Sequence, residues 1–185
     1  MTADLITGAD FIAMFDSVTT SARRLETRDR YAADQPRLER WLAGEMDAIP
    51  TEGARKVWLD RIRTTTAAAG ATWRRVRVVR DPLTLGQRFL LMAARQSVEA
   101  GEDIRYVFRT TANERELPAH DFWLLDDDRL ALLWFAGDDR TLGAQIVRDE
   151  AVVRQHRKWL DRAEKAATPY RDFLAADPAR ERRTG

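Results

Sequence analysis

The sequence predicts an α/β fold in which helices flank a mixed β-sheet. Three observations point to this class. Apolar residues repeat with helical spacing and with strand spacing by turns across residues 53–109. Residues 117–135 then read as two apolar strands joined by an acidic turn, and residues 149–163 read as a closing helix. Strands that alternate with helices require crossover connections, and such connections produce a sheet that is covered by helices.

Residues 10–50 are expected to form an N-terminal extension that is mainly helical. Apolar side chains over residues 10–18 have helical spacing. Residues 19–28 contain β-branched residues in loose alternation, which favours a strand. Pro36 marks the start of a short helix, because proline suits the first helical turn, and Gly44 ends that helix.

The later elements follow from the same rules. Gly70 ends a helix that begins near Gly53, and Pro82 ends the strand that comes next. Residues 177–185 are charged and read as a disordered tail, so residues 1–176 make a single domain. The remaining expected elements are helices over 53–69, 84–100, 149–163 and 168–175, strands over 72–80, 103–109 and 143–147, and a polar loop over 110–117.

Composition narrows the class of partner. The chain has 185 residues with 31 basic and 30 acidic side chains, and this near-neutral balance argues against a dedicated nucleic-acid partner. The absence of cysteine excludes disulfides, thiolate metal sites and a cysteine nucleophile, and it agrees with a cytoplasmic location. No stretch approaches the about 18–20 apolar residues of a membrane span. The N-terminus also lacks the basic and apolar segments of a signal peptide.

His120 is the candidate catalytic residue. The spacing H-x-F-x-x-x-x-D from His120 to Asp127 resembles the H-x-K-x-x-x-x-D signature of the phospholipase D superfamily. In that superfamily the histidine attacks phosphorus and the lysine holds the phosphoryl oxygens. Phe122 stands at the lysine position and cannot stabilise developing charge. The superfamily also needs two motifs, so the resemblance implies a degenerate and inactive site without a metal or cofactor. A second H-x-K, which begins at His156, falls in the expected last helix and is interpreted as a solvent-exposed face.

Wider stretches carry the resemblance further. G-E-D-I-R-Y-V from Gly101 and L-P-A-H-D-F-W-L-L-D-D from Leu117 resemble the degenerate phospholipase D-like domains of bacterial transcriptional regulators. Residues 53–165 would then be a core similar to one half of such a domain. R-L-E-T-R-D-R-Y from Arg24 also resembles a family of small actinobacterial proteins of unknown function. Members of that family tend to be encoded near helix-turn-helix regulators, which implies such a regulator as the partner.

An arginine group beside the hairpin is the candidate ligand site. Arg24, Glu26 and Arg28 fall at alternate positions of the expected strand, so they share one face. One glutamate among these arginines leaves a positive surplus, and arginine forks bind carboxylates and phosphates. We expect these residues to bind an anion together with Arg105 from a neighbouring strand and Asp121 from the hairpin. The alternative is an exposed, charged sheet face.

Two further patterns are interpreted as structural. Asp126-Asp127-Asp128 is expected to be a polar hairpin turn, because calcium and magnesium sites need more oxygen ligands from spaced positions. Trp123, Trp134 and Trp159 stand among aliphatic residues and are expected to lie in the core.

The sequence therefore favours a catalytically inactive regulatory or interaction module that acts with a helix-turn-helix regulator. Two alternatives stay open. A homodimeric phosphodiesterase or nuclease would bring together two copies of His120, with Arg105 replacing the missing lysine. A sensor would bind a small anionic ligand through the arginine group.

Overall fold

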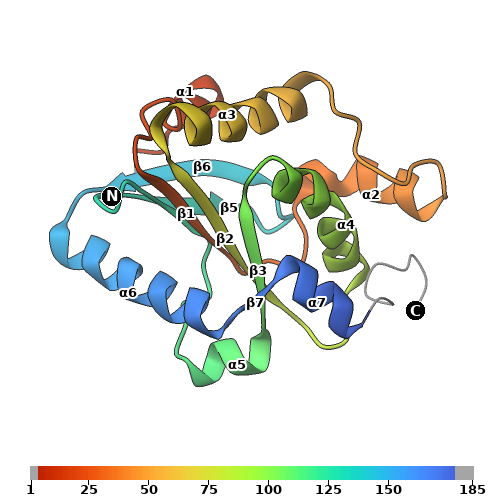
Figure 1. The fold of residues 1–185 in the computed structure, drawn as a ribbon. Helices are drawn as coiled ribbons and strands as arrows, with labels where there is room; N and C mark the ends of the chain where they lie inside the picture. Colours follow the sequence, from red (N-terminus) through yellow and green to blue (C-terminus); the bar gives the residue numbers. More distant parts are fainter. Residues whose placement is uncertain (1–3, 178–185) are drawn as a thin grey trace.

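A single mixed sheet organises the molecule (Figure 1). The computed structural model describes residues 4–177, and it confirms the expected α/β architecture with helices on both faces of the sheet. The strand order is β6-β5-β4-β1-β2-β3-β7. The strands are β1 (Ser21–Glu26), β2 (Thr72–Val79), β3 (Asp103–Phe108), β4 (Phe122–Leu125), β5 (Arg129–Phe135), β6 (Thr141–Val147) and β7 (Thr168–Pro169).

The centre of the sheet is parallel. β1 pairs with β2 and β2 with β3 in parallel, whereas β4, β5, β6 and β7 each join the sheet antiparallel to a neighbour. Helix α3 (Gly53–Ala69) precedes β2, and α4 (Leu85–Glu99) connects β2 to β3. Both crossovers advance in the same direction across the sheet, so their helices lie on the same face. The carboxyl ends of the three parallel strands consequently meet at one edge.

The other helices complete the two layers (Figure 1). α1 (Gly8–Ala13) lies with α3 on one face, and α5 (Arg109–Glu114) and α6 (Glu150–Ala166) lie on the other. The short helix η1 (Ala32–Asp34) leads into α2 (Gln35–Leu42), which packs against α4. α7 (Tyr170–Ala176) follows β7 and lies against β3.

Side-chain alternation along the strands produces two apolar layers. On the α3 side, the rings of Trp73 and Trp123 lie 6.0 and 5.0 Å from that of Phe15. On the other side, Phe122 is fully buried in a layer that includes Leu160 of α6. Such aromatic packing contributes much of the apolar burial of a sheet of this size.

Some expectations about single segments were wrong. Residues 110–117, expected to be a loop, contain most of α5, and the expected helix over 168–175 begins with the two residues of β7. Trp123 is buried as expected, but Trp134 is 47% exposed because it lies beyond the last residue of β5 that pairs with β4. The expected tail covers residues 177–185, of which 178–185 lie outside the described part.

Candidate functional site

A pocket of about 760 Å³ lies at the carboxyl ends of the parallel strands. Arg28 and Arg30 follow β1, Arg80 follows β2, and Arg109 follows β3. We call this site the arginine pocket. In α/β sheets, ligands bind outside the carboxyl ends of strands where the chain connectivity reverses direction. Here the reversal lies between β1 and β4, because the chain builds one half of the sheet through β2 and β3 and the other through β4.

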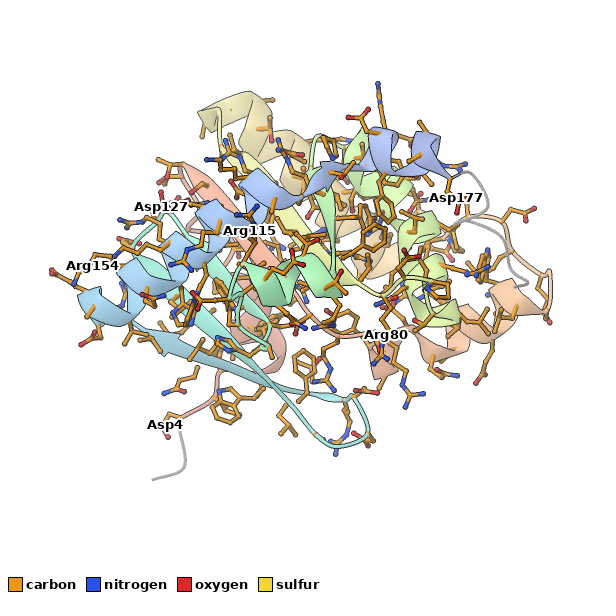
Figure 2. The ribbon with its side chains drawn as sticks, turned by 90° about the horizontal axis from the view of Figure 1, so that it is seen from below. Asp4, Arg80, Arg115, Asp127, Arg154 and Asp177 are labelled. Atoms are coloured by element: carbon orange, nitrogen blue, oxygen red, sulfur yellow. The ribbon has the colours of Figure 1, made fainter. Side chains whose placement is uncertain are left out.

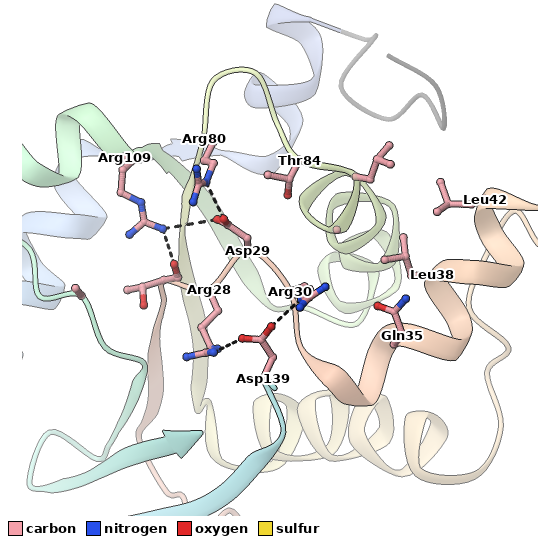
Figure 3. A pocket seen from close by; sticks show the side chains of 14 residues that line it. Arg28, Asp29, Arg30, Gln35, Leu38, Leu42, Arg80, Thr84, Arg109 and Asp139 are labelled. Carbon is pink, nitrogen blue, oxygen red and sulfur yellow. Dashed lines mark hydrogen bonds and ion pairs between the residues drawn. The ribbon is translucent and has the colours of Figure 1, made fainter. Parts of the chain in front are cut away.

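Two aspartates hold the four arginines (Figure 3). Asp139, in the turn between β5 and β6, accepts from Arg30 Nε at 2.7 Å and also pairs with Arg28. Asp29 accepts from Arg80 Nε at 2.7 Å, and its other oxygen lies 3.9 Å from a nitrogen of Arg109.

The electrostatic consequence is a positive surplus. Four guanidinium cations face two carboxylates among the residues that line the pocket, a difference of two positive charges. Hydrogen bonds from Arg30 and then Arg28 lower the pKa of Asp139. The pocket can therefore accept an additional anion at neutral pH.

The first turn of α4 forms one wall of the pocket. Thr84 and Gln87 make a capping box. The Thr84 hydroxyl oxygen accepts from the backbone N–H of Gln87, and the side-chain oxygen of Gln87 accepts from the backbone N–H of Thr84. The amide of Gln87 also donates to Asp29 at 2.9 Å. A Cβ atom on Gly86 would lie 2.7 Å from the Asp29 backbone oxygen, so this position needs glycine for the close approach. The helix N-terminus, which favours anions, is thus fixed against the arginine-bearing loop.

Asp121 fastens the other side of that loop. This buried carboxylate accepts from the backbone and the hydroxyl of Thr27, at 2.7 and 2.9 Å, and from the Tyr31 hydroxyl at 2.6 Å. Burial raises the pKa of Tyr31, and the charges of Glu26 and Asp121 add to this effect. Asp121 therefore holds both ends of the loop that carries Arg28 and does not line the arginine pocket itself.

Behind the pocket lies a buried charge cluster, which we define as Arg24, Glu26, Arg75, Arg77 and Glu102. Glu26 lies 3.0, 2.8 and 2.6 Å from nitrogens of Arg24, Arg75 and Arg77, and Arg75 also donates to Glu102 at 2.8 Å. Burial alone would raise the pKa of Glu26, but the three arginine charges together lower it to about 2. Glu26 is therefore ionised throughout the neutral range, as a buried carboxylate must be when it faces three cations.

The structure brings together only part of the predicted ligand group. Arg24 and Glu26 lie side by side in the charge cluster, and Arg28 lines the arginine pocket next to it. Arg105 does not join them. It bonds to Asp103 of its own strand at 2.8–3.1 Å and faces the carbonyl of Glu164 in α6. Alternation along β3 points Tyr106 toward the α4 side and Arg105 toward the α6 side.

His120 meets the other histidine of the chain. Its Nε2 lies 3.1 Å from Nε2 of His156, and Nδ1 of His156 lies 2.8 Å from the Val152 carbonyl. Because a carbonyl only accepts, Nδ1 of His156 carries the proton, so His120 donates from Nε2 when both rings are neutral. Burial lowers the pKa of both rings. The interpretation of His156 as part of a solvent-exposed face was wrong, because its side chain is buried against Phe122.

The acidic turn over residues 126–128 accepts hydrogen bonds from the backbone at the start of β1. Asp126 accepts hydrogen bonds from the backbone N–H groups of Thr19, Thr20 and Ser21 at 2.7–3.2 Å, and its φ of 51° is left-handed. Asp127 lies at the opposite end of β4 from His120 and pairs with Arg23 at 3.3 Å. Residues 4–177 contain no group of three or more His, Cys, Asp or Glu side chains that could hold a metal ion.

The surface around α6 is also highly charged. Figure 2 shows Asp127 and Arg154 beside α6 on the left of the view, away from Arg80. Asp127 pairs with Arg23 at 3.3 Å and lies 3.8 Å from a nitrogen of Arg157. Neither Asp127 nor Arg154 lines the arginine pocket.

The comparison with protein families identifies the chain at the level of a family. Residues 9–175 match the model of a domain of unknown function, DUF6879. The chain belongs to the DUF6879 family. This confirms the expected membership of a family of unknown function. A search of curated proteins found no match to the chain. Within residues 4–177, no helix has the length and apolar character to cross a membrane.

Sequence reasoning missed most residues of the arginine pocket. Arg80 and Arg109 are the last residues of the expected strands 72–80 and 103–109, and parallel strands end at the same edge of a sheet. That was a usable signal. Arg75 and Arg77 were also missed as members of the charge cluster. They lie two and four residues after Trp73, so they share one face of the strand with it.

Proposed function

We propose that this DUF6879 protein is a non-catalytic sensor module that binds a small anionic ligand in the arginine pocket. The observation that carries the proposal is the convergence of four arginines from three parallel strands on one pocket that supplies only two carboxylates. Arginine forks suit phosphate and carboxylate groups, because two parallel N–H donors match two oxygens.

The rest of the pocket supports binding more than catalysis. The loop with Arg28 is fastened by Asp121 on one side and by the first turn of α4 on the other. A site held in this way loses little conformational freedom when a ligand binds. No histidine, serine or lysine is among the described residues that line the pocket, and its two carboxylates, Asp29 and Asp139, are both paired with arginines.

The proposal agrees with a regulatory role. A bound anion would be the input, and the binding surface for a helix-turn-helix regulator would be the output. That partnership, the phospholipase D-like ancestry and an actinobacterial origin come from the sequence resemblance and stay predictions.

Titration with inorganic phosphate and pyrophosphate tests the proposal, with calorimetry and thermal unfolding as readouts. A ligand at about 100 times its dissociation constant stabilises a protein by about 2.7 kcal/mol. We expect Arg80→Ala to weaken binding by about tenfold through the loss of one charged donor. Arg63→Ala is the matched control, because Arg63 is similarly exposed and also pairs with a single aspartate, in α3.

Asp139→Asn should strengthen anion binding, whereas Arg80→Ala should weaken it. It releases Arg28 and Arg30 from their internal carboxylate. We expect affinity for phosphate to rise by about three- to tenfold, since one negative charge near the ligand is removed. Absence of saturable binding to either anion, or equal affinities for wild type, Arg80→Ala and Asp139→Asn, would contradict the proposed function.

A further inference from the structure

The arginine pocket has a second, apolar side. Leu38 and Leu42 of α2 and Leu85 of α4 line it together with the arginines. In Figure 3, Leu38 and Leu42 lie on one side, and Arg28, Arg80 and Arg109 lie on the other.

The leucines remain accessible to a ligand. Leu42 is 39% exposed and Leu85 is 45% exposed, whereas Leu38 is only 9% exposed. A single exposed leucine is ordinary on a protein surface. Here two exposed leucines, Leu42 and Leu85, line the same pocket as the four arginines. A ligand that covers them gains from removing apolar surface from water.

The volume of the pocket also favours a ligand larger than a phosphate ion. A volume of about 760 Å³ falls in the range of about 300–1,000 Å³ that is typical of pockets for organic ligands. A bare phosphate ion would contact the arginines and leave the leucine side in water. A larger ligand can satisfy both walls.

We infer that the ligand is a small, soluble organic phosphate whose phosphate group meets the arginines and whose apolar or aromatic body lies against Leu42 and Leu85. This inference rests on the proposed function, since it assumes that the arginines bind an anion. It adds the class of ligand, a phosphate monoester with an apolar body.

The charge distribution orients this ligand. Arg80 and Arg109 share Asp29, whose second oxygen already accepts from Gln87, so these two arginines keep donors that the carboxylate does not occupy. The first turn of α4 adds N–H groups near the same place, because Gly86 packs against Asp29. Leu85 begins this helix, so a phosphate at its N-terminus places the ester substituent next to the leucine side.

Methyl phosphate and phenyl phosphate distinguish the two contributions. They carry the same phosphate group and differ in the apolar body. We expect the wild-type protein to bind phenyl phosphate about tenfold more tightly than methyl phosphate, as measured by calorimetry. The double variant Leu42→Ala, Leu85→Ala should reduce that ratio to about one and leave the affinity for methyl phosphate unchanged. Leu142→Ala is the control, because Leu142 is 41% exposed on β6 and does not line the pocket.

The results distinguish an error in the class of ligand from an error in the proposed anion binding. If methyl phosphate binds in a manner that depends on Arg80 but phenyl phosphate binds no more tightly, the class of ligand is wrong and the anion site stands. If neither phosphate binds, both fail. Lipid vesicles test the other source of the same chemistry. We expect that the protein does not sediment with phosphatidylcholine vesicles that contain phosphatidic acid. If the protein sediments with these vesicles and Arg80→Ala abolishes the effect, the inference that the ligand is soluble is wrong.

Discussion

Glu26→Gln tests the buried charge cluster most directly. The Glu26 carboxylate lies within 2.6–3.0 Å of three arginine nitrogens, and its side chain is only 4% exposed. Glutamine keeps the shape of the side chain but cannot offset the charges of Arg24, Arg75 and Arg77. Removing one partner from a buried ion pair costs about 3–5 kcal/mol, because the other charge is left buried without compensation.

That loss is a large part of the stability expected for this chain. Natural domains unfold with about 5–15 kcal/mol, so a loss of about 3–5 kcal/mol is at least about one fifth of the free energy of unfolding. Urea unfolding followed by tryptophan fluorescence measures it, since Trp73 and Trp123 are buried beside the cluster. Asp60→Asn is the control, because Asp60 is exposed and its ion pairs contribute at most about 1 kcal/mol.

The pH dependence adds an independent check. The pKa of Glu26 falls from 4.5 in an unfolded chain to about 2 in the folded protein. A lowered carboxylate pKa gives stability that is present above pH 4.5 and is lost as the pH falls toward 2. The difference in stability between wild type and Glu26→Gln should therefore shrink between pH 5 and pH 2. A cost below about 1 kcal/mol at pH 7, or a difference that does not change with pH, would refute the reasoning.

Two further variants test the contacts of His120 and Asp121, which immediately precede β4. Burial lowers the pKa of His120 and His156 below 6.5, so the neutral pair stabilises the protein above that pH and this stability is lost on acidification. The fall in melting temperature from pH 7.5 to pH 5.5 should be smaller in His156→Gln than in wild type, and equal falls would contradict it. Asp121→Asn should cost about 1–3 kcal/mol in urea unfolding and should also weaken phosphate binding, because Thr27 loses its charged acceptor. Lower stability with unchanged phosphate binding would show that Asp121 does not position the pocket.

The fold could be predicted because its signals are local. Each long helix carries an apolar stripe, and β2 and β3 each begin after a glycine that ends a helix, Gly70 and Gly101. α5 has no such stripe: of its six residues R-T-T-A-N-E, only Ala112 is buried. Ala112 packs in the same apolar layer as Val78 of β2 and Val107 of β3, a long-range contact that sequence periodicity does not indicate.

Only those features of the site that depend on a single strand could be predicted from the sequence. Alternation along β1 places Arg24 and Glu26 on one face, and this was correct. The residues opposite them depend on strand order and register. The register pairs Arg24 with Arg75 and Glu26 with Arg77, and it places Arg105 opposite Val76 on the face toward α6. No single-strand pattern contains that information, so Arg105 was grouped with the wrong face.

The polar residues at the start of the hairpin contact both layers of the molecule. His120 and Asp121 are neighbours, and successive side chains at the start of a strand point to opposite faces. His120 contacts His156 and thereby ties the hairpin to α6, whereas Asp121 bonds to Thr27 and Tyr31 and ties it to the loop of the arginine pocket. The dipeptide thus fastens both layers to the same strand. Asp121 therefore holds the loop of the proposed anion site in place, whereas the four arginines of that site follow the ends of the three parallel strands.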